Sequence, residues 1–257
     1  MSVALITGAS KGIGKAIAIE LAARKYDLVL VARSAALLQS VAVELREKYK
    51  VEVDYFAIDL SLSDSPQRIF DWCAEKKYSI NVLVNNAGYG LSGLFDKYSV
   101  AENTNMLQLN IIALSQMCQL FLPQLKNQSE SYILNIASSA AYQAVPYLSL
   151  YSASKSFVLS FSRGLRQELR KTSVSVTCIS PGSTDTDFAN RAQIGEKGLK
   201  TAEKVNMQPQ VVAKIAVDSM FAGKAEVITG LINKLGAFMV WLMPKSLVEK
   251  TAMKIYE

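Results

Sequence analysis

The stretch YSASK at residues 151–155 places a tyrosine and a lysine four residues apart in a chain that contains no histidine. On a helix, this spacing puts both side chains on one face. A phenol has an ordinary pKa near 10, so proton transfer at neutral pH requires a lowering of about 3 units, or roughly 4 kcal/mol. One cation about 4 Å away, at an effective dielectric constant near 20, contributes on the order of 4 kcal/mol. Tyr151 beside Lys155 could therefore exchange protons in place of histidine, although an ordinary exposed helix carries the same pair.

A glycine-rich turn, TGASKGIG at residues 7–14, follows the first apolar run of the chain. Its glycines, Gly8, Gly12 and Gly14, allow the backbone to turn tightly and to approach a pyrophosphate, and the helix that follows offers its N-terminal N–H groups and positive dipole. The spacing differs from the commoner G-x-G-x-x-G, and such turns also occur as plain connectors. Its position in the first strand, turn and helix of an alternating chain favours a dinucleotide site.

Two cations beside this turn indicate which dinucleotide. Arg33 ends the next apolar run about 20 residues after Gly14, where an NAD site usually carries a carboxylate for the ribose hydroxyl. An arginine there favours a 2′-phosphate, and Lys11 supplies a second cation. The sequence therefore predicts NADP(H) rather than NAD(H), against the alternative that both are solvated surface cations.

These residues need a scaffold, and seven short β-branched runs alternate with helical patterns along the chain. This alternation predicts an α/β fold, a doubly wound seven-stranded parallel sheet (Rossmann fold) in a three-layer sandwich. We expect residues 1–257 to form a single domain, with 187–208 as a lid insertion and 231–257 as a C-terminal helical extension. The expected strands lie within 3–7, 27–32, 51–59, 81–88, 132–138, 174–180 and 225–230.

Composition narrows the class of protein further. Half of the residues are hydrophobic and 19% are charged, as in a packed globular protein. The net charge of +6 could suggest nucleic acid, but the basic residues are scattered and recognised motifs are missing, so no nucleic-acid partner is expected. Cys73, Cys118 and Cys178 are odd in number and far apart, which suits buried free thiols better than disulfides or a metal site. A reducing, cytoplasmic location follows as an expectation.

Neither a secretory signal nor a transmembrane segment is expected. The first candidate strand begins at residue 3, which leaves no room for a signal peptide. No apolar run approaches the ~18 residues needed to span a bilayer, and the nearest is LGAFMVWLM at 235–243.

Four motifs, TGASKGIG (7–14), NNAG (85–88), YSASK (151–155) and PGSTDT (181–186), resemble the short-chain dehydrogenase/reductase family in order and spacing. The resemblance implies a catalytic tetrad of Asn110, Ser138, Tyr151 and Lys155. In that family pattern Tyr151 is the acid–base group, Ser138 orients the carbonyl oxygen, and Asn110 holds a water in a proton relay. Lys155, together with the oxidised nicotinamide, lowers the pKa of the phenol. Without the resemblance, Ser138 would be read as a turn or capping serine. Asn110 has poor helix propensity, which favours an interior role, and an exposed helix asparagine is its alternative.

The same resemblance implies the cofactor contacts. Asp59 would contact the adenine amino group, although an N-cap carboxylate is its alternative interpretation. Thr184 stands where the family usually has an apolar residue. The full predicted set is Gly8, Ser10, Lys11, Gly12, Ile13, Gly14, Arg33, Asp59, Leu60, Asn86, Ala87, Gly88, Tyr151, Lys155, Pro181, Gly182, Thr184 and Thr186.

The C-terminal segment departs from the family pattern. LGAFMVWLM is followed by Pro244 and by a basic stretch with Leu247, Thr251 and Ile255 at helical spacing. A core-covering or dimer-interface helix, a peripheral membrane contact and a lid over a lipid-like substrate all fit this pattern. The family implies a homodimer or a homotetramer.

Together, these features predict an NADP(H)-dependent oxidoreductase that transfers a hydride between the nicotinamide and a carbonyl or secondary alcohol. Candidate pocket residues at 89–95, 142–148 and 187–208 are apolar and aromatic, which suggests a hydrophobic small-molecule substrate. The alternative is a non-catalytic NADP-binding regulatory protein that has kept the fold but not the chemistry.

Overall fold

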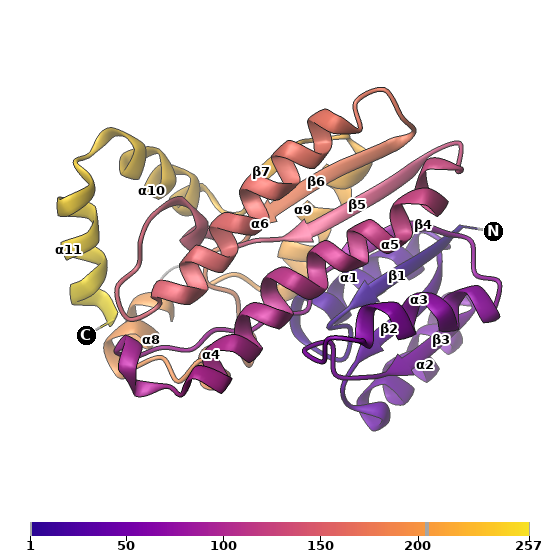
Figure 1. Cartoon of the computed structure of the whole chain (residues 1–257), viewed down its shortest axis with the longest axis horizontal. Coiled ribbons are helices and arrows are strands. Elements are labelled where there is room, and N and C mark those ends of the chain that lie inside the picture. Colours follow the sequence, from indigo (N-terminus) through magenta and orange to yellow (C-terminus); the bar gives the residue numbers. More distant parts are fainter. Residues whose placement is uncertain (1, 204–205, 257) are drawn as a thin grey trace.

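A seven-stranded parallel sheet runs through the centre of the computed structural model, which describes residues 2–203 and 206–256 (Figure 1). Its strand order is β3-β2-β1-β4-β5-β6-β7, and every neighbouring pair is parallel. All seven expected strands are present, so the predicted fold class is confirmed. Their bounds are β1 Val3–Thr7, β2 Asp27–Ala32, β3 Val53–Ala57, β4 Ile80–Asn85, β5 Ser131–Ile136, β6 Val174–Ser180 and β7 Glu226–Ile228.

Helices cover both faces of the sheet, and alternate residues of each strand therefore enter different cores. In β1, Leu5 belongs to a core with α3, α5 and α6, whereas Ile6 belongs to a core with α1, α2 and α9. The helices are α1 Gly12–Ala23, α2 Ala35–Tyr49, α3 Ser65–Glu75, α4 Val100–Leu107, α5 Leu114–Lys126, α6 Ser149–Glu168, α7 Phe188–Arg191, α8 Glu196–Glu203, α9 Pro209–Phe221, α10 Leu231–Leu242 and α11 Lys245–Tyr256, with short helices η1 Phe95–Lys97, η2 Gln108–Ala113 and η3 Ser139–Tyr142.

One helical stretch bears on the expectation that the chain has no transmembrane segment. Residues Val100–Lys126 form a continuous helix with a mean hydropathy of 1.2, which is long and apolar enough to cross a membrane by length and composition. Of its apolar 18-residue window, 44% is buried, and Met117, Cys118 and Phe121 pack in the core on the α5 side of the sheet. Its apolar character is therefore accounted for by the core that it fills.

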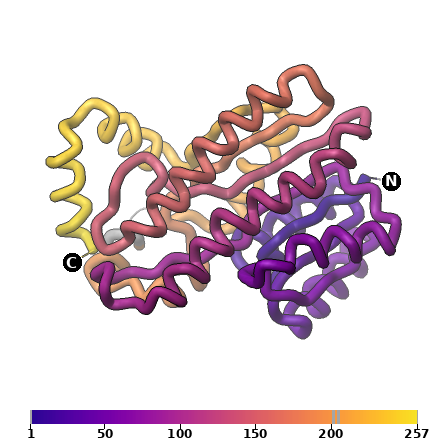
Figure 2. Tube along the Cα trace, in the orientation of Figure 1, coloured from indigo at the N-terminus to yellow at the C-terminus, as the bar shows by residue number. Residues whose placement is uncertain are grey.

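The 187–208 segment and the C-terminal segment meet at one end of the molecule, as the trace in Figure 2 shows. The former carries α7 and α8, and its residues 204 and 205 lie outside the described residues. The C-terminal segment is helical as expected, but the predicted stripe on α11 is wrong. Leu247 and Thr251 are exposed, and Ala252 is the buried residue, because α11 packs on α8 through the adjacent face.

Gly14 fixes the path of the chain from β1 into α1. A Cβ atom on Gly14 would lie well under 3.0 Å from both the Gly8 carbonyl oxygen and Asn86 Nδ2. Asn86 is itself bound to this turn, since its Nδ2 donates to the Thr7 carbonyl oxygen at 3.0 Å. Only a residue without a side chain lets the turn, the helix and the end of β4 approach this closely.

The Gly14→Ala variant should therefore lower the free energy of unfolding by about 3 kcal/mol, because the added methyl group meets backbone that cannot move aside. Gly164→Ala is the matched control. Gly164 lies inside α6 with nothing within 4 Å of its would-be Cβ, so alanine there should stabilise by about 0.5 to 1 kcal/mol. Chemical denaturation of both variants measures the difference, and equal stabilities would contradict the steric account.

Candidate active site

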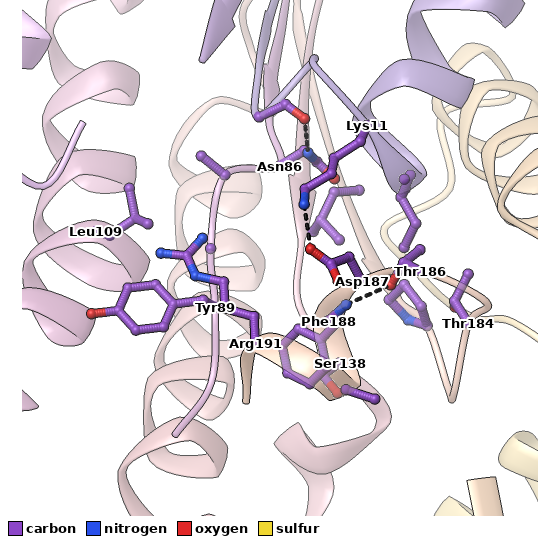
Figure 3. A pocket seen from close by; sticks show the side chains of 18 of the residues that line it. Lys11, Asn86, Tyr89, Leu109, Ser138, Thr184, Thr186, Asp187, Phe188 and Arg191 are labelled. Carbon is purple, nitrogen blue, oxygen red and sulfur yellow. Dashed lines mark hydrogen bonds and ion pairs between the residues drawn. The ribbon is translucent and has the colours of Figure 1, made fainter. Parts of the chain in front are cut away.

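A cavity of about 710 Å³ opens at the carboxyl edge of the sheet, where β1 and β4 lie side by side and the strand order reverses (Figure 3). Ligands of open parallel sheets bind at such a switch point. Most of the predicted site residues line this cavity. They are Gly8, Ser10, Lys11, Gly12, Ile13, Arg33, Asp59, Leu60, Asn86, Ala87, Gly88, Ser138, Tyr151, Lys155, Pro181, Gly182, Thr184 and Thr186.

Gly14 and Asn110, which are both described by the structure, complete the predicted set but do not line the cavity. Gly14 lies behind the turn and shapes it, as shown above. Asn110 lies behind Gly88, where a Cβ atom would be 3.0 Å from Asn110 Oδ1 and 3.4 Å from Lys155 Nζ. Gly88 thus allows Asn110 and Lys155 to approach the same point of the cavity wall.

The glycine-rich turn has the geometry of an anion site. Gly8 and Gly12 adopt φ angles of +67° and +60°, which side chains other than glycine rarely take. Lys11, Gly12 and Ile13 line the cavity, so the N-terminus of α1 faces it with its positive dipole. Lys11 is the N-cap residue of α1, and its side chain makes no capping hydrogen bond there. The backbone and dipole therefore fit the pyrophosphate of a dinucleotide.

Lys11 also forms an ion pair with Asp187, which precedes α7 on the opposite wall of the cavity (Figure 3). Both side chains are about half exposed or more. The pair links the glycine-rich turn to the 187–208 segment, a contact that no local sequence signal indicates.

Arg33 and Asp59 lie together at the neighbouring end of the cavity. Arg33 Nη1 is 4.0 Å from Asp59 Oδ2, and the arginine side chain is 60% exposed. Asp59 Oδ1 accepts hydrogen bonds from Ser61 N at 3.0 Å and Ser61 Oγ at 2.7 Å. The N-cap of α3 is Asp64, so Asp59 is a cavity residue and not a helix cap.

Arg191 of α7 was not singled out by the sequence. Its guanidinium carbon lies 4.0 Å from the centroid of the Tyr89 ring, over the face of the ring. Figure 3 shows the Arg191 guanidinium beside the Tyr89 ring, on the side away from Lys11 and Asp187. The sequence around Arg191 shows no helical period, and no other arginine lies near it in the chain. No local sequence pattern therefore predicts that this side chain lies at the cavity.

Tyr151 and Lys155 lie on the same face of α6, as their spacing predicts, and both are almost fully buried. Lys155 Nζ donates a hydrogen bond to the Ile136 carbonyl oxygen at 2.9 Å and lies 5.9 Å from the centroid of the Tyr151 ring. Ser138, two residues after β5, lines the cavity beside them and also accepts a hydrogen bond from Ala140 N at 3.1 Å. It therefore both caps η3 and faces the cavity.

Burial dominates the acid–base chemistry of this pair. It raises the pKa of Tyr151 to about 12, and the hydrogen bond with Ser138 opposes the rise only in part. Burial likewise lowers the pKa of Lys155 to about 8. In the protein alone, desolvation therefore keeps the pKa of the phenol above its ordinary value. The expectation that Lys155 lowers this pKa together with an oxidised nicotinamide stays a prediction.

Asn110 owes its position to an irregular helix. It lies in η2, a π-helical turn between α4 and α5, which places a side chain differently from a regular α-helix. Asn110 is buried, accepts from Tyr89 N at 3.1 Å and donates to the Tyr89 carbonyl oxygen at 2.9 Å. Its Nδ2 also donates to Ser154 Oγ at 3.1 Å. The alternative of an exposed helix asparagine is excluded.

Tyr256, near the C-terminus, also lines the cavity together with Ile194 and Gly198. Its ring packs on Gly198, where a Cβ atom would come within 3.4 Å. Since α11 lies far from the other wall residues in sequence, only the fold reveals this contribution.

This combination, a dinucleotide-sized cavity at the switch point with a buried tyrosine, lysine and serine, defines a nicotinamide-dependent oxidoreductase. Comparison with known proteins agrees. Residues 2–197 match the short chain dehydrogenase family, and the chain belongs to the short-chain dehydrogenase/reductase family.

Three proteins that are similar to this chain illustrate the range of its relatives. An uncharacterized oxidoreductase of Staphylococcus saprophyticus is 35% identical over 206 residues, which cover 78% of this chain and 88% of that protein. The very-long-chain 3-oxoacyl-CoA reductase-A of Danio rerio is 38% identical over 182 residues, covering 69% and 56%. A short-chain dehydrogenase from Sphingobium yanoikuyae in complex with NADPH superimposes with a TM-score of 0.83 at 29% identity, covering 95% of each chain.

The lowered pKa of Lys155 predicts how stability depends on pH. Lys155 is protonated in the unfolded chain up to its ordinary pKa of about 10.4, but in the folded protein it loses its proton near pH 8. The unfolded state binds more protons between these values, so the destabilising effect of the buried cation is full below pH 8 and disappears as the pH rises.

Wild-type protein should therefore gain about 3 kcal/mol of stability relative to Lys155→Met between about pH 7 and pH 10.5. The other titrating groups are present in both proteins, so their effects cancel in the difference. Denaturation of the two proteins across this range measures it. A difference that does not change with pH would contradict the burial of a titrating ammonium group.

Proposed function

We propose that this protein reduces the carbonyl group of a hydrophobic substrate with NADPH, or oxidises the corresponding secondary alcohol with NADP⁺. The observation that carries the proposal is that Ser138, Tyr151 and Lys155 face the same cavity as the glycine-rich turn and Arg33. A proton donor, an oxygen-orienting hydroxyl and a phosphate-binding turn are the parts that hydride transfer to a carbonyl requires.

Each side chain has a distinct role in this proposal. A bound nicotinamide would exchange the hydride with the substrate carbon. Ser138 Oγ donates a hydrogen bond to the substrate oxygen, and Tyr151 gives its phenolic proton to that oxygen as negative charge develops. Lys155, which is held by the Ile136 carbonyl oxygen, stabilises the resulting phenolate. Asn110 lies within reach of the same wall and supports return of the proton through water.

The preference for NADP(H) rests on the charge around the adenosine end. Arg33 and Lys11 line this region, and Arg191 reaches it from α7. These three cations outnumber the two nearby carboxylates, Asp59 and Asp187, and the excess of positive charge suits a 2′-phosphate. A bidentate arginine is the best side chain for binding such a phosphate. The NADPH bound by the similar Sphingobium yanoikuyae enzyme supports this preference.

The walls of the cavity support a hydrophobic substrate. Leu148, Phe188, Ile194 and Tyr256 line it together with the catalytic tyrosine, and the Tyr151 and Phe188 rings lie with centroids 5.2 Å apart. Apolar and aromatic walls with a few polar groups are typical of sites for small hydrophobic ligands. The name of the Danio rerio relative, a reductase of very-long-chain 3-oxoacyl-CoA, is consistent with such a substrate.

The Tyr151→Phe variant should lose at least about 10³-fold in kcat while binding NADPH with nearly unchanged affinity, because it removes only the proton donor. NADPH-linked turnover on a panel of hydrophobic aldehydes and ketones measures the loss, and fluorescence titration measures the binding. If wild type were silent across a broad panel but bound NADPH, the non-catalytic regulator would be favoured. Substantial turnover by Tyr151→Phe would show that the proton comes from another group.

The Arg33→Ala variant should raise the Kd for NADPH by about 10-fold and change the Kd for NADH by less than about 3-fold, because only NADPH carries the 2′-phosphate. Lys15→Ala is a control of the same charge. Lys15 lies one turn into α1, is paired with Glu44 and does not line the cavity. Equal losses for the two cofactors in Arg33→Ala would contradict the assignment of the 2′-phosphate site.

A further inference from the structure

Helix α10 exposes an unusual amount of apolar surface. Of its twelve residues, all described by the structure, none is buried, and seven large hydrophobic side chains are between 44% and 82% exposed. These are Leu231, Ile232, Leu235, Phe238, Met239, Trp241 and Leu242. Monomeric proteins rarely leave contiguous apolar patches of this kind in water, so this surface calls for a partner.

The exposed residues occupy one continuous side of the helix. Their spacing covers about half of its circumference, while Asn233, Ala237 and Val240 on the other side are half-buried toward the protein. Asn233 anchors that inner side, since its Nδ2 donates to the Thr229 carbonyl oxygen at 2.8 Å. The helix is therefore fixed to the body with its apolar side outward. In Figure 1, α10 and α11 stand at the end of the molecule, away from the sheet.

The polar groups around the patch are mostly basic. Residues 231–256 contain four lysines, Lys234, Lys245, Lys250 and Lys254, and a single acidic residue, Glu249. All four lysines are exposed. A second copy of this chain packed on the patch would bring two sets of lysines together, whereas an anionic lipid surface would complement them.

Size and composition also match a lipid surface. Twelve residues of helix are about 18 Å long, which is too short to cross a hydrocarbon core of about 30 Å. Phe238 and Trp241 are both more than half exposed and stack with centroids 6.2 Å apart. Aromatic and aliphatic residues beside lysines are the composition of helices that lie in the plane of the membrane interface.

We infer that α10 is an interfacial membrane anchor that binds the surface of bilayers containing anionic lipids, with the lysines of α10 and α11 contacting the headgroups. The inference is independent of the proposed chemistry, because neither Phe238 nor Trp241 lines the cavity. It predicts reversible binding that weakens as salt screens the headgroups.

Vesicle sedimentation of the full chain tests it, with vesicles of phosphatidylcholine alone and of phosphatidylcholine containing about 30% phosphatidylserine. Wild type should pellet with the anionic vesicles and less with the neutral ones. F238S/W241S should lower the partition coefficient by about 10-fold or more, because it removes both aromatic anchors. K245Q/K250Q, which removes two of the four lysines, should weaken the preference for anionic vesicles, and an unchanged preference would contradict the role of these lysines.

L62S/V100S is the matched control, since Leu62 and Val100 are exposed by 51% and 83% away from this patch, and it should bind vesicles like wild type. Thermal unfolding establishes that each variant is folded. The inference is overturned if wild type stays in the supernatant with anionic vesicles, or if F238S/W241S pellets like wild type. A wild-type dimer that ignores vesicles and dissociates in F238S/W241S would also overturn it and assign the patch to an interface between copies.

Discussion

The proposed chemistry depends on a lysine ammonium and a phenol that are buried side by side. Without a charged ligand, desolvation pushes both groups toward their neutral forms, with the pKa of Tyr151 raised to about 12 and that of Lys155 lowered to about 8. A buried site of this kind responds strongly to one added charge, because the local dielectric constant is low. The cationic nicotinamide of an oxidised cofactor is such a charge, and the phenol would become an effective proton carrier when it binds.

The rest of the fold holds these two groups against the cofactor site. Three glycines allow neighbouring segments to approach closely because they carry no side chain. Gly14 lies behind the glycine-rich turn, Gly12 lies against Thr186, and Gly88 lies in front of Lys155 and Asn110. The parallel sheet brings the ends of β1, β4, β5 and β6 to one edge, and α6 lies across it with Tyr151 and Lys155 on its inner face. At Gly14 the approach leaves no room for a side chain, whereas at Gly12 and Gly88 the neighbouring side-chain atoms, 3.1 and 3.0 Å from a Cβ, would have to shift slightly.

The sequence predicts the framework well because the framework depends on local patterns. Apolar runs identify all seven strands, with the bounds of β1, β2 and β6 matching the structure. The positions of Ser138, Tyr151, Lys155 and the glycine-rich turn at one cavity follow from the resemblance to the family. The pKa of Tyr151 could not be predicted, since it depends on burial, which spacing does not report. Arg191 and Tyr256 reach the cavity only through tertiary packing. The π-helical turn at Asn110 could not be predicted either, because no characteristic residue pattern marks such a turn in the sequence.

The central claim is that a bound oxidised cofactor, acting with Lys155, brings the pKa of Tyr151 toward neutrality. Carbon-13 labelling of tyrosine Cζ reports this directly by NMR, with the Tyr151 signal identified as the one missing from the Tyr151→Phe protein. The account predicts that Tyr151 titrates near pH 12 in the free protein and several units lower with NADP⁺ bound. A Tyr151 signal that still titrates near pH 12 in the complex would contradict it.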